Sequence, residues 1–125
     1  MPAHTAEECD ALFGQFLNAG DLERLVALYE PDASLVQQSG PTASGTAAIR
    51  QALAAFVAMQ PRITMNVTRT ERCGDDLAVL YNDWSLSAKG PGGKPITLTG
   101  KAIEIVRRQK DGTWLFAVDD QFARD

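Results

Sequence analysis

The hydrophobic pattern of this chain changes its period near Pro61, and this change restricts the folds that the chain can form. Before Pro61, apolar side chains recur every three or four residues, as on one face of an α-helix. Beyond it, apolar and polar residues alternate over 63–68, as along a half-buried β-strand. Helices followed by strands are typical of an α+β protein, and 125 residues leave room for one domain, 1–125.

Three helices are predicted in the first half of the chain. The first begins with a capping box at 5–8 and ends at Gly20, which supplies a left-handed end. Asp21 is a suitable N-cap for a second helix, whose apolar face we expect to include Tyr29. The alanine-rich segment 46–58 predicts the third helix.

Consecutive strands separated by turns are predicted in the second half, and they favour an antiparallel sheet. The expected strands are 63–68, 77–88, 96–109 and 114–122. Because long strands twist, the sheet curves, and helices packed across it enclose a cone with an apolar interior. Concave apolar spaces of this kind are common binding sites for small molecules.

Charge and composition exclude several kinds of partner. The chain has 12 Lys and Arg against 16 Asp and Glu, a net charge of -4, whereas nucleic-acid binding needs a basic surface. No apolar run approaches the roughly 20 residues that span a bilayer. Two cysteines and one histidine are scattered, so no metal site is predicted, and free thiols fit the reducing cytoplasm. We expect a cytoplasmic protein without nucleic-acid or membrane partners.

The segments LNAGDL at 17–22 and LVALYEPDA at 25–33 resemble the opening of the nuclear transport factor 2-like superfamily. That superfamily includes ketosteroid isomerase and the SnoaL-like polyketide cyclases. Segments 45–49 and 111–114 are similar to it as well, and the resemblance covers about residues 5 to 122. It implies a cone-shaped α+β fold, with three N-terminal helices on a curved, mainly antiparallel sheet, and a homodimer formed through the sheet's outer face. It does not select a function, because one fold serves enzymes and binding modules alike.

The resemblance to ketosteroid isomerase can be followed position by position. That enzyme moves a proton beside a carbonyl group with an Asp base and an oxyanion hole of a Tyr and a protonated Asp. Here the tyrosine position falls on Phe13, which has no hydroxyl group, and the base position falls on Gln37, which lacks basicity. The acid position falls on Glu104, which keeps a carboxyl group. The isomerase arrangement is therefore not expected, although a pocket for apolar rings remains.

Two carboxyl groups are candidates for acid–base chemistry. Glu104 has apolar neighbours on both sides; inside the cone its pKa would rise, and the alternative is a residue that faces solvent or pairs with an Arg. Asp119 and Asp120 are adjacent, so at most one faces the pocket; the resemblance favours Asp119, and a one-residue slip in register would reverse this. The other expected pocket residues are Phe13, Phe16, Tyr29, Gln37, Asn82, Trp84, Ala117 and Gln121.

Two classes of function follow from this pattern. The first is an isomerase, cyclase or dehydratase that acts on a small hydrophobic molecule, with Glu104 or Asp119 as acid or base and with no cofactor. The second is a module that binds a ligand or dimerises without chemistry, because Phe13 and Gln37 stand where the isomerase needs a donor and a base. Both carboxyl groups inside one apolar cavity would favour the enzyme.

Overall fold

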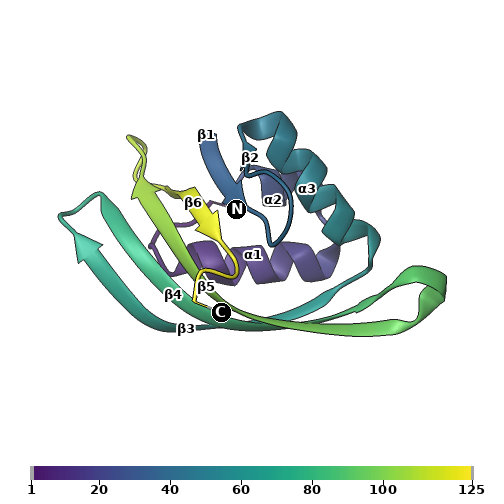
Figure 1. Ribbon diagram of the computed structural model, residues 1–125. Helices are drawn as coiled ribbons and strands as arrows, with labels where there is room; N and C mark the ends of the chain where they lie inside the picture. The colour runs from purple at the N-terminus through teal and green to yellow at the C-terminus, as the bar shows by residue number, and fades with distance from the viewer. Residues whose placement is uncertain (1, 125) are drawn as a thin grey trace.

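Residues 2–124 of the computed structural model form three α-helices on one face of a curved, six-stranded sheet (Figure 1). The sheet has the strand order β2-β1-β6-β5-β4-β3, and every neighbouring pair is antiparallel except β1 and β6. The predicted α+β class is therefore confirmed. The elements are α1 (Glu8–Ala19), α2 (Leu22–Val26), β1 (Tyr29–Val36), β2 (Ala43–Ser44), α3 (Thr46–Ala58), β3 (Arg62–Cys73), β4 (Leu77–Lys89), a 3-10 turn η1 (Pro91–Gly93), β5 (Pro95–Arg108) and β6 (Trp114–Asp120).

Local signals placed the first helix correctly. The Thr5 hydroxyl accepts the N–H of Glu8 at 3.2 Å, and the Glu8 carboxylate accepts the N–H of Thr5 at 3.1 Å, which completes the capping box. Gly20 has φ 70° and ends α1 in the left-handed conformation. Asp21 then accepts the N–H of Arg24 at 3.1 Å and caps α2.

The second helix is shorter than predicted, and the placement of Tyr29 on it was wrong. Tyr29 begins β1, which pairs in parallel with β6 so that Tyr29 lies beside Phe116. The two rings pack with centroids 5.0 Å apart, and the N–H of Phe116 donates to the carbonyl of Leu28 at 2.8 Å. This pairing joins segments far apart in the chain, so the spacing of nearby apolar residues could not indicate it.

A β-bulge in β6 decides which of its side chains face inward. Ile105 pairs with Val118 and Val106 with Phe116, which leaves Ala117 without a partner between them. Because of this extra residue, Phe116 and Asp119 both face the interior although they are three positions apart. The expectation that Ala117 shares the pocket with Asp119 assumed strict alternation, and it was wrong.

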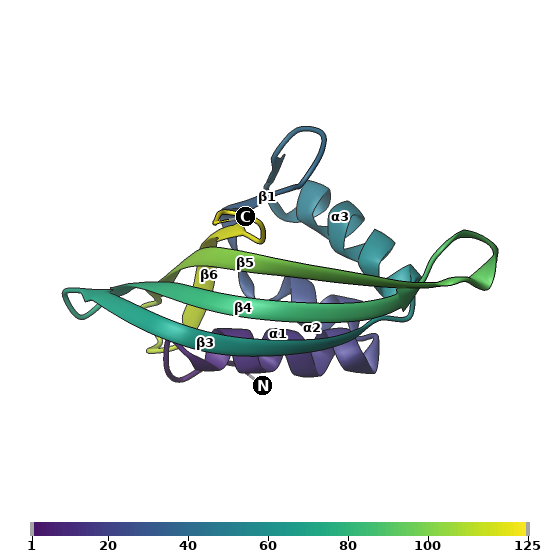
Figure 2. The same cartoon turned by 60° about the horizontal axis from the view of Figure 1, so that its bottom comes forward.

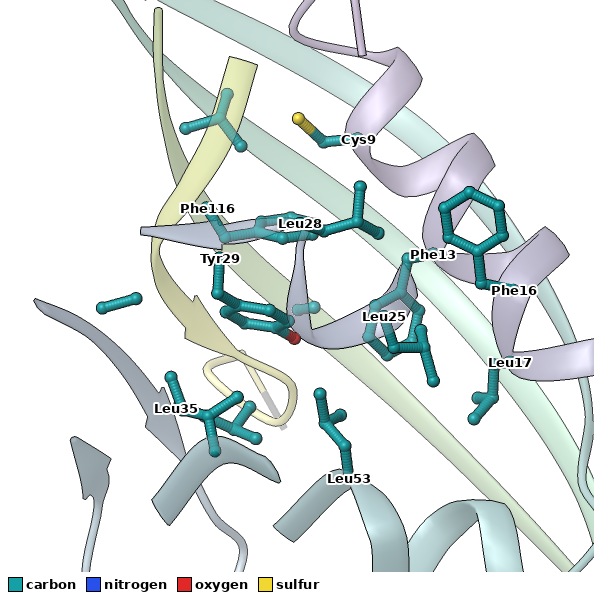
Figure 3. Close-up of a cluster of buried hydrophobic side chains, with 14 of the residues drawn as sticks. Cys9, Phe13, Phe16, Leu17, Leu25, Leu28, Tyr29, Leu35, Leu53 and Phe116 are labelled. Atoms are coloured by element: carbon teal, nitrogen blue, oxygen red, sulfur yellow. The ribbon is translucent and has the colours of Figure 1, made fainter. Parts of the chain in front are cut away.

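The core lies between the helices and the concave face of the sheet. Figure 2 shows β3, β4 and β5 running side by side across α1 and α3. Phe13 of α1 meets Phe116 of β6 edge to face with centroids 6.2 Å apart, and Figure 3 shows Leu25 and Leu53 in the same interior. No helix within residues 2–124 is long and apolar enough to cross a membrane.

Candidate functional site

A narrow cavity remains between α1, α3 and the inner face of the sheet. Its volume is about 20 Å³, which is room for about one water molecule. Aromatic and aliphatic side chains form most of its wall, and no Arg, Lys or His is among them. The lining residues are Phe13, Leu17, Phe56, Ile63, Met65, Trp84, Leu86, Glu104, Asp119 and Gln121.

Glu104 and Asp119 form the acidic part of this wall. They are directly opposite each other on β5 and β6, and their exposed fractions are 2% and 1%. Residues opposed in this way have Cβ atoms about 5 Å apart, so the carboxyl groups are close neighbours. Asp120 is only half-buried and points to the other face of the sheet. Of the two adjacent aspartates, the structure therefore brings Asp119 to the cavity.

Tyr29 supports Asp119 from behind the cavity wall. Its hydroxyl group donates to the Oδ2 atom of Asp119 at 2.5 Å. Burial raises the pKa of Asp119 from an ordinary 3.8 to about 7, although the hydrogen bond from Tyr29 opposes this rise. Burial and the charge of Asp119 raise the pKa of Tyr29 well above its ordinary value, so this hydroxyl remains a donor at neutral pH.

A third buried carboxyl group, Asp10 of α1, joins the cluster through Asn82 of β4. The amide nitrogen of Asn82 donates to Asp10 Oδ2 at 3.1 Å and to Glu104 Oε2 at 2.9 Å. Asp10 and Asn82 are 1% and 0% exposed. Burial first, and then the charge of Asp10, raise the pKa of Glu104 well above its ordinary range. Glu104 therefore releases its proton at a higher pH than an ordinary Glu does.

Sequence reasoning did not single out Asp10. The available signal was its spacing, because Asp10 stands three positions before Phe13 and seven before Leu17, on the apolar stripe of α1. A carboxylate on such a stripe is buried only if the rest of the fold supplies partners for it. Those partners come from strands far along the chain.

Each of the four buried polar residues has one oxygen without a hydrogen-bond partner among the described residues. These atoms are Asp10 Oδ1, Asn82 Oδ1, Glu104 Oε1 and Asp119 Oδ1. An unpaired buried polar atom costs about 1–3 kcal/mol, so four of them in one cluster require a physical explanation. Within residues 2–124 no cluster of side chains is suited to a metal ion. The arrangement is instead suited to giving and taking protons.

Trp84 closes one side of the cavity in a fixed position. Its indole N–H donates to the carbonyl of Gln121 at 2.8 Å, and its ring packs against Phe122 with centroids 5.3 Å apart. A Cβ atom on the facing Gly100 would lie 2.4 Å from the ring. Only glycine leaves the indole room to lie flat on β5.

The structure brings most of the expected site residues together. Five line the cavity, and two hydrogen-bond to its carboxyl groups from behind the wall. The first group is Phe13, Trp84, Glu104, Asp119 and Gln121; the second is Tyr29 and Asn82.

Phe16, Gln37 and Ala117 lie away from this cavity. Phe16 is buried beneath Arg24 and lines a separate depression with Ala27 and Leu28. The Gln37 amide donates to the carbonyl of Pro41 at 2.9 Å and lines an adjoining depression of about 200 Å³. That depression and the cavity share Phe56 and Gln121 as lining residues, so Gln37 lies in a space that adjoins the cavity.

The cone-shaped fold around buried carboxyl groups agrees with the resemblance that the sequence bears to the nuclear transport factor 2-like superfamily. The chain belongs to the SnoaL-like domain family, whose model matches residues 10–117. No curated protein sequence matches it.

Solved structures support the same fold. A ketosteroid isomerase-like protein from Erwinia carotovora atroseptica has a TM-score of 0.82 at 15% identity, over 95% of this chain and 93% of that one. A proposed calcium/calmodulin-dependent protein kinase II association domain from Xanthomonas campestris has a TM-score of 0.80 at 21% identity, over 97% of this chain and 90% of that one. A proposed dehydratase of the NTF2-like family from Streptomyces avermitilis has a TM-score of 0.74 at 19% identity, over 91% of this chain and 90% of that one. Identities this low carry the fold alone.

Proposed function

We propose that this protein catalyses proton transfer on a small, uncharged, hydrophobic molecule that binds in the cone. The observation that carries the proposal is the buried Glu104–Asp119 pair on one wall of an apolar cavity. Asp119, with a pKa of about 7, is ionised in a large share of molecules at neutral pH and serves as the base. Glu104 keeps its proton and serves as the acid.

The side-by-side placement of acid and base favours particular reactions. Asp119 takes a proton from a carbon atom beside a carbonyl group, and Glu104 gives its proton to the carbonyl oxygen or to a leaving hydroxyl group. The first outcome is enolisation or isomerisation, and the second is loss of water. Two structural relatives bear names from these reaction classes, a ketosteroid isomerase-like protein and a proposed dehydratase. An anionic substrate is disfavoured because carboxyl groups line the cavity without a cation.

The size of the cavity determines how a substrate would enter. The inner space holds about one water molecule, whereas the adjoining depression near Gln37 has about 200 Å³. We infer that the reacting end of the substrate enters the inner cavity and that its body lies in the depression. Phe56 and Gln121 belong to both spaces, so rotation of their side chains would widen the passage.

Hydrogen exchange tests the proposal without knowledge of the natural substrate. Cyclic ketones such as cyclopentanone, cyclohexanone and indanone are incubated with the protein in heavy water, and deuterium uptake beside the carbonyl group is followed by NMR. We expect catalysed exchange that D119N lowers at least about a hundredfold and that E104Q also lowers. The matched control is D120N, which changes the adjacent carboxyl group on the opposite face and is expected to retain exchange about one pH unit above the pKa of Asp119. Exchange that persists in D119N would contradict the proposal.

The small cavity also favours a second candidate, a module that binds or dimerises without chemistry. Because side chains fill nearly all of the interior, they can serve as a close-packed core that stabilises the fold without binding a substrate. A thermal-shift screen of hydrophobic ring compounds separates the two, because a ligand that binds the native state raises its stability. Absence of both a shift and ketone exchange would favour the second candidate.

We propose further that two copies associate through the outer face of the sheet. Half-buried apolar side chains there continue from strand to strand, since Val79 pairs with Ile105 and Ile105 pairs with Val118. A second copy of this face would cover them. Sedimentation is expected to show that the wild type is a dimer and that the I105K variant is a monomer. A monomeric wild type would exclude the assembly.

We also propose the cytoplasm as the location of the protein, with which the free thiols of Cys9 and Cys73 agree.

A further inference from the structure

We propose that Asp10 is a positioning residue that assigns the catalytic proton to Glu104, and this inference rests on the proposed acid–base function. Asp10 does not line the cavity and so has no direct route to a substrate. It acts on Glu104 through its charge, and the shared amide of Asn82 holds the two carboxyl groups side by side.

The hydrogen bonds of Asn82 fix the orientation of the acid. One amide nitrogen donates to Asp10 Oδ2 at 3.1 Å and to Glu104 Oε2 at 2.9 Å, so both of its hydrogens are used. Glu104 Oε2 is thereby held as an acceptor. Its other oxygen, Oε1, has no partner among the described residues and is the atom left to carry a proton.

The position of Glu104 between two like groups favours the proton there. Asp10 faces it from α1 and Asp119 from β6, while the neutral Asn82 faces it from β4. Tyr29 of β1 reaches the cluster through Asp119. An ionised Glu104 would stand between two carboxyl groups, whereas an ionised Asp10 or Asp119 has a protonated Glu104 as its neighbour. The walls from α3 and β3 are apolar at Phe56, Ile63 and Met65 and supply no compensating charge.

A purely structural role for Asp10 makes a different prediction. If Asp10 only fills a buried polar position, D10N preserves its shape and its bond to Asn82, and the titration of Glu104 stays unchanged. If Asp10 assigns the proton, D10N removes the charge that opposes ionisation of Glu104. The titration midpoint of Glu104 then falls by about one to three pH units, toward that of Asp119.

Carbon NMR of the side-chain carboxyl groups measures this shift in the free protein. The resonances of Glu104 and Asp119 are assigned with E104Q and D119N, and each midpoint is followed in wild type and D10N. The control is D75N, which makes the same change in an exposed turn and is expected to leave Glu104 unchanged. An unchanged Glu104 midpoint in D10N would overturn the proposal.

A reciprocal measurement keeps the test decisive if D10N does not fold. Coupling between two titrating groups acts equally in both directions. In wild type, the titration curve of Asp10 should therefore show the influence of the ionisation of Glu104. In E104Q this influence should be lost, and the midpoint of Asp10 should change. A single uncoupled Asp10 titration curve, identical in wild type and E104Q, would refute the assignment.

The two proposals fail in different ways. A D10N shift without ketone exchange in the wild type would leave the proton assignment standing and remove the catalytic function. Ketone exchange that D119N abolishes, with an unchanged Glu104 midpoint in D10N, would leave catalysis standing and remove the role of Asp10. Where both hold, the basic limb of the exchange rate against pH moves to lower pH in D10N.

Discussion

Glu104 and Asp119 are directly opposite each other on neighbouring antiparallel strands, and both side chains are almost completely buried. Like charges so placed repel each other strongly, and cross-strand pairs of this kind destabilise a sheet unless one member is protonated. The two carboxyl groups therefore titrate together, and a proton on one of them relieves the repulsion between them. This relationship makes the stability of the fold depend on pH in an unusual direction.

Stability should fall as pH rises through the acidic to neutral range. The pKa of Asp119 lies at about 7 in the folded protein and near 3.8 ordinarily, so folded chains retain a proton that unfolded chains release. The stabilisation is complete below the unfolded value and is lost as pH rises toward the folded one, by up to about 1.4 kcal/mol per pH unit. Glu104, whose pKa lies well above its ordinary value, extends the decline to higher pH.

Urea unfolding at several pH values measures this decline. D119N is expected to reduce the slope of the unfolding free energy against pH by one proton between about pH 4 and pH 7. D120N should keep this slope and only move its upper end to lower pH, because the charge of Asp120 contributes to the raised pKa of Asp119. A stability that is constant or that rises over that window in the wild type would show that Asp119 is not protonated in the fold.

The origin of the pair explains what the sequence could and could not reveal. The capping box, Gly20 and the change of period depend on residues near one another, and they located the helices and the sheet. The resemblance already favoured Asp119 as the inward residue, whereas the position of Ala117 outside the cavity depends on a bulge that no alternation rule contains. Asp10 needs an Asn from a strand 72 positions away, and a single sequence does not show that contact. Non-local contacts therefore decided the parts that were missed.

Y29F should lower the fraction of Asp119 that is ionised, and so able to act as the base, at neutral pH. The lost hydroxyl donates to Asp119 and lowers its pKa, so its removal raises the pKa of Asp119 above about 7. The acidic limb of ketone exchange moves to higher pH, and above that pH the unfolding free energy falls by about 1.5–3 kcal/mol because an ionised carboxylate loses its donor.

The control for this change is the chain's other tyrosine, Tyr81, which lies on the outer face of the sheet near Arg69 and Arg124. Y81F is expected to leave the Asp119 titration unchanged. A Y29F protein with an Asp119 midpoint equal to or below that of the wild type would show that the short hydrogen bond does not govern the base.

G100A should disturb the wall of the cavity. The added methyl group would lie 2.4 Å from the indole of Trp84, so the ring must move and its hydrogen bond to the Gln121 carbonyl must break. Overpacking of this kind costs about 1–3 kcal/mol. Unfolding curves measure the loss, and the Trp84 indole N–H resonance should shift in NMR spectra.

G14A provides the matched control on the facing helix, with the opposite sign. A methyl group there would make ordinary contacts, 3.7 Å from the sulfur of Met65 and 3.9 Å from Ile63, and alanine is the better helix former. We expect G14A to stabilise the fold by about 0.5–1 kcal/mol. Equal losses in both variants would mean that the interior tolerates no added volume anywhere. A loss confined to G100A would locate the constraint at the indole that separates the cavity from the sheet.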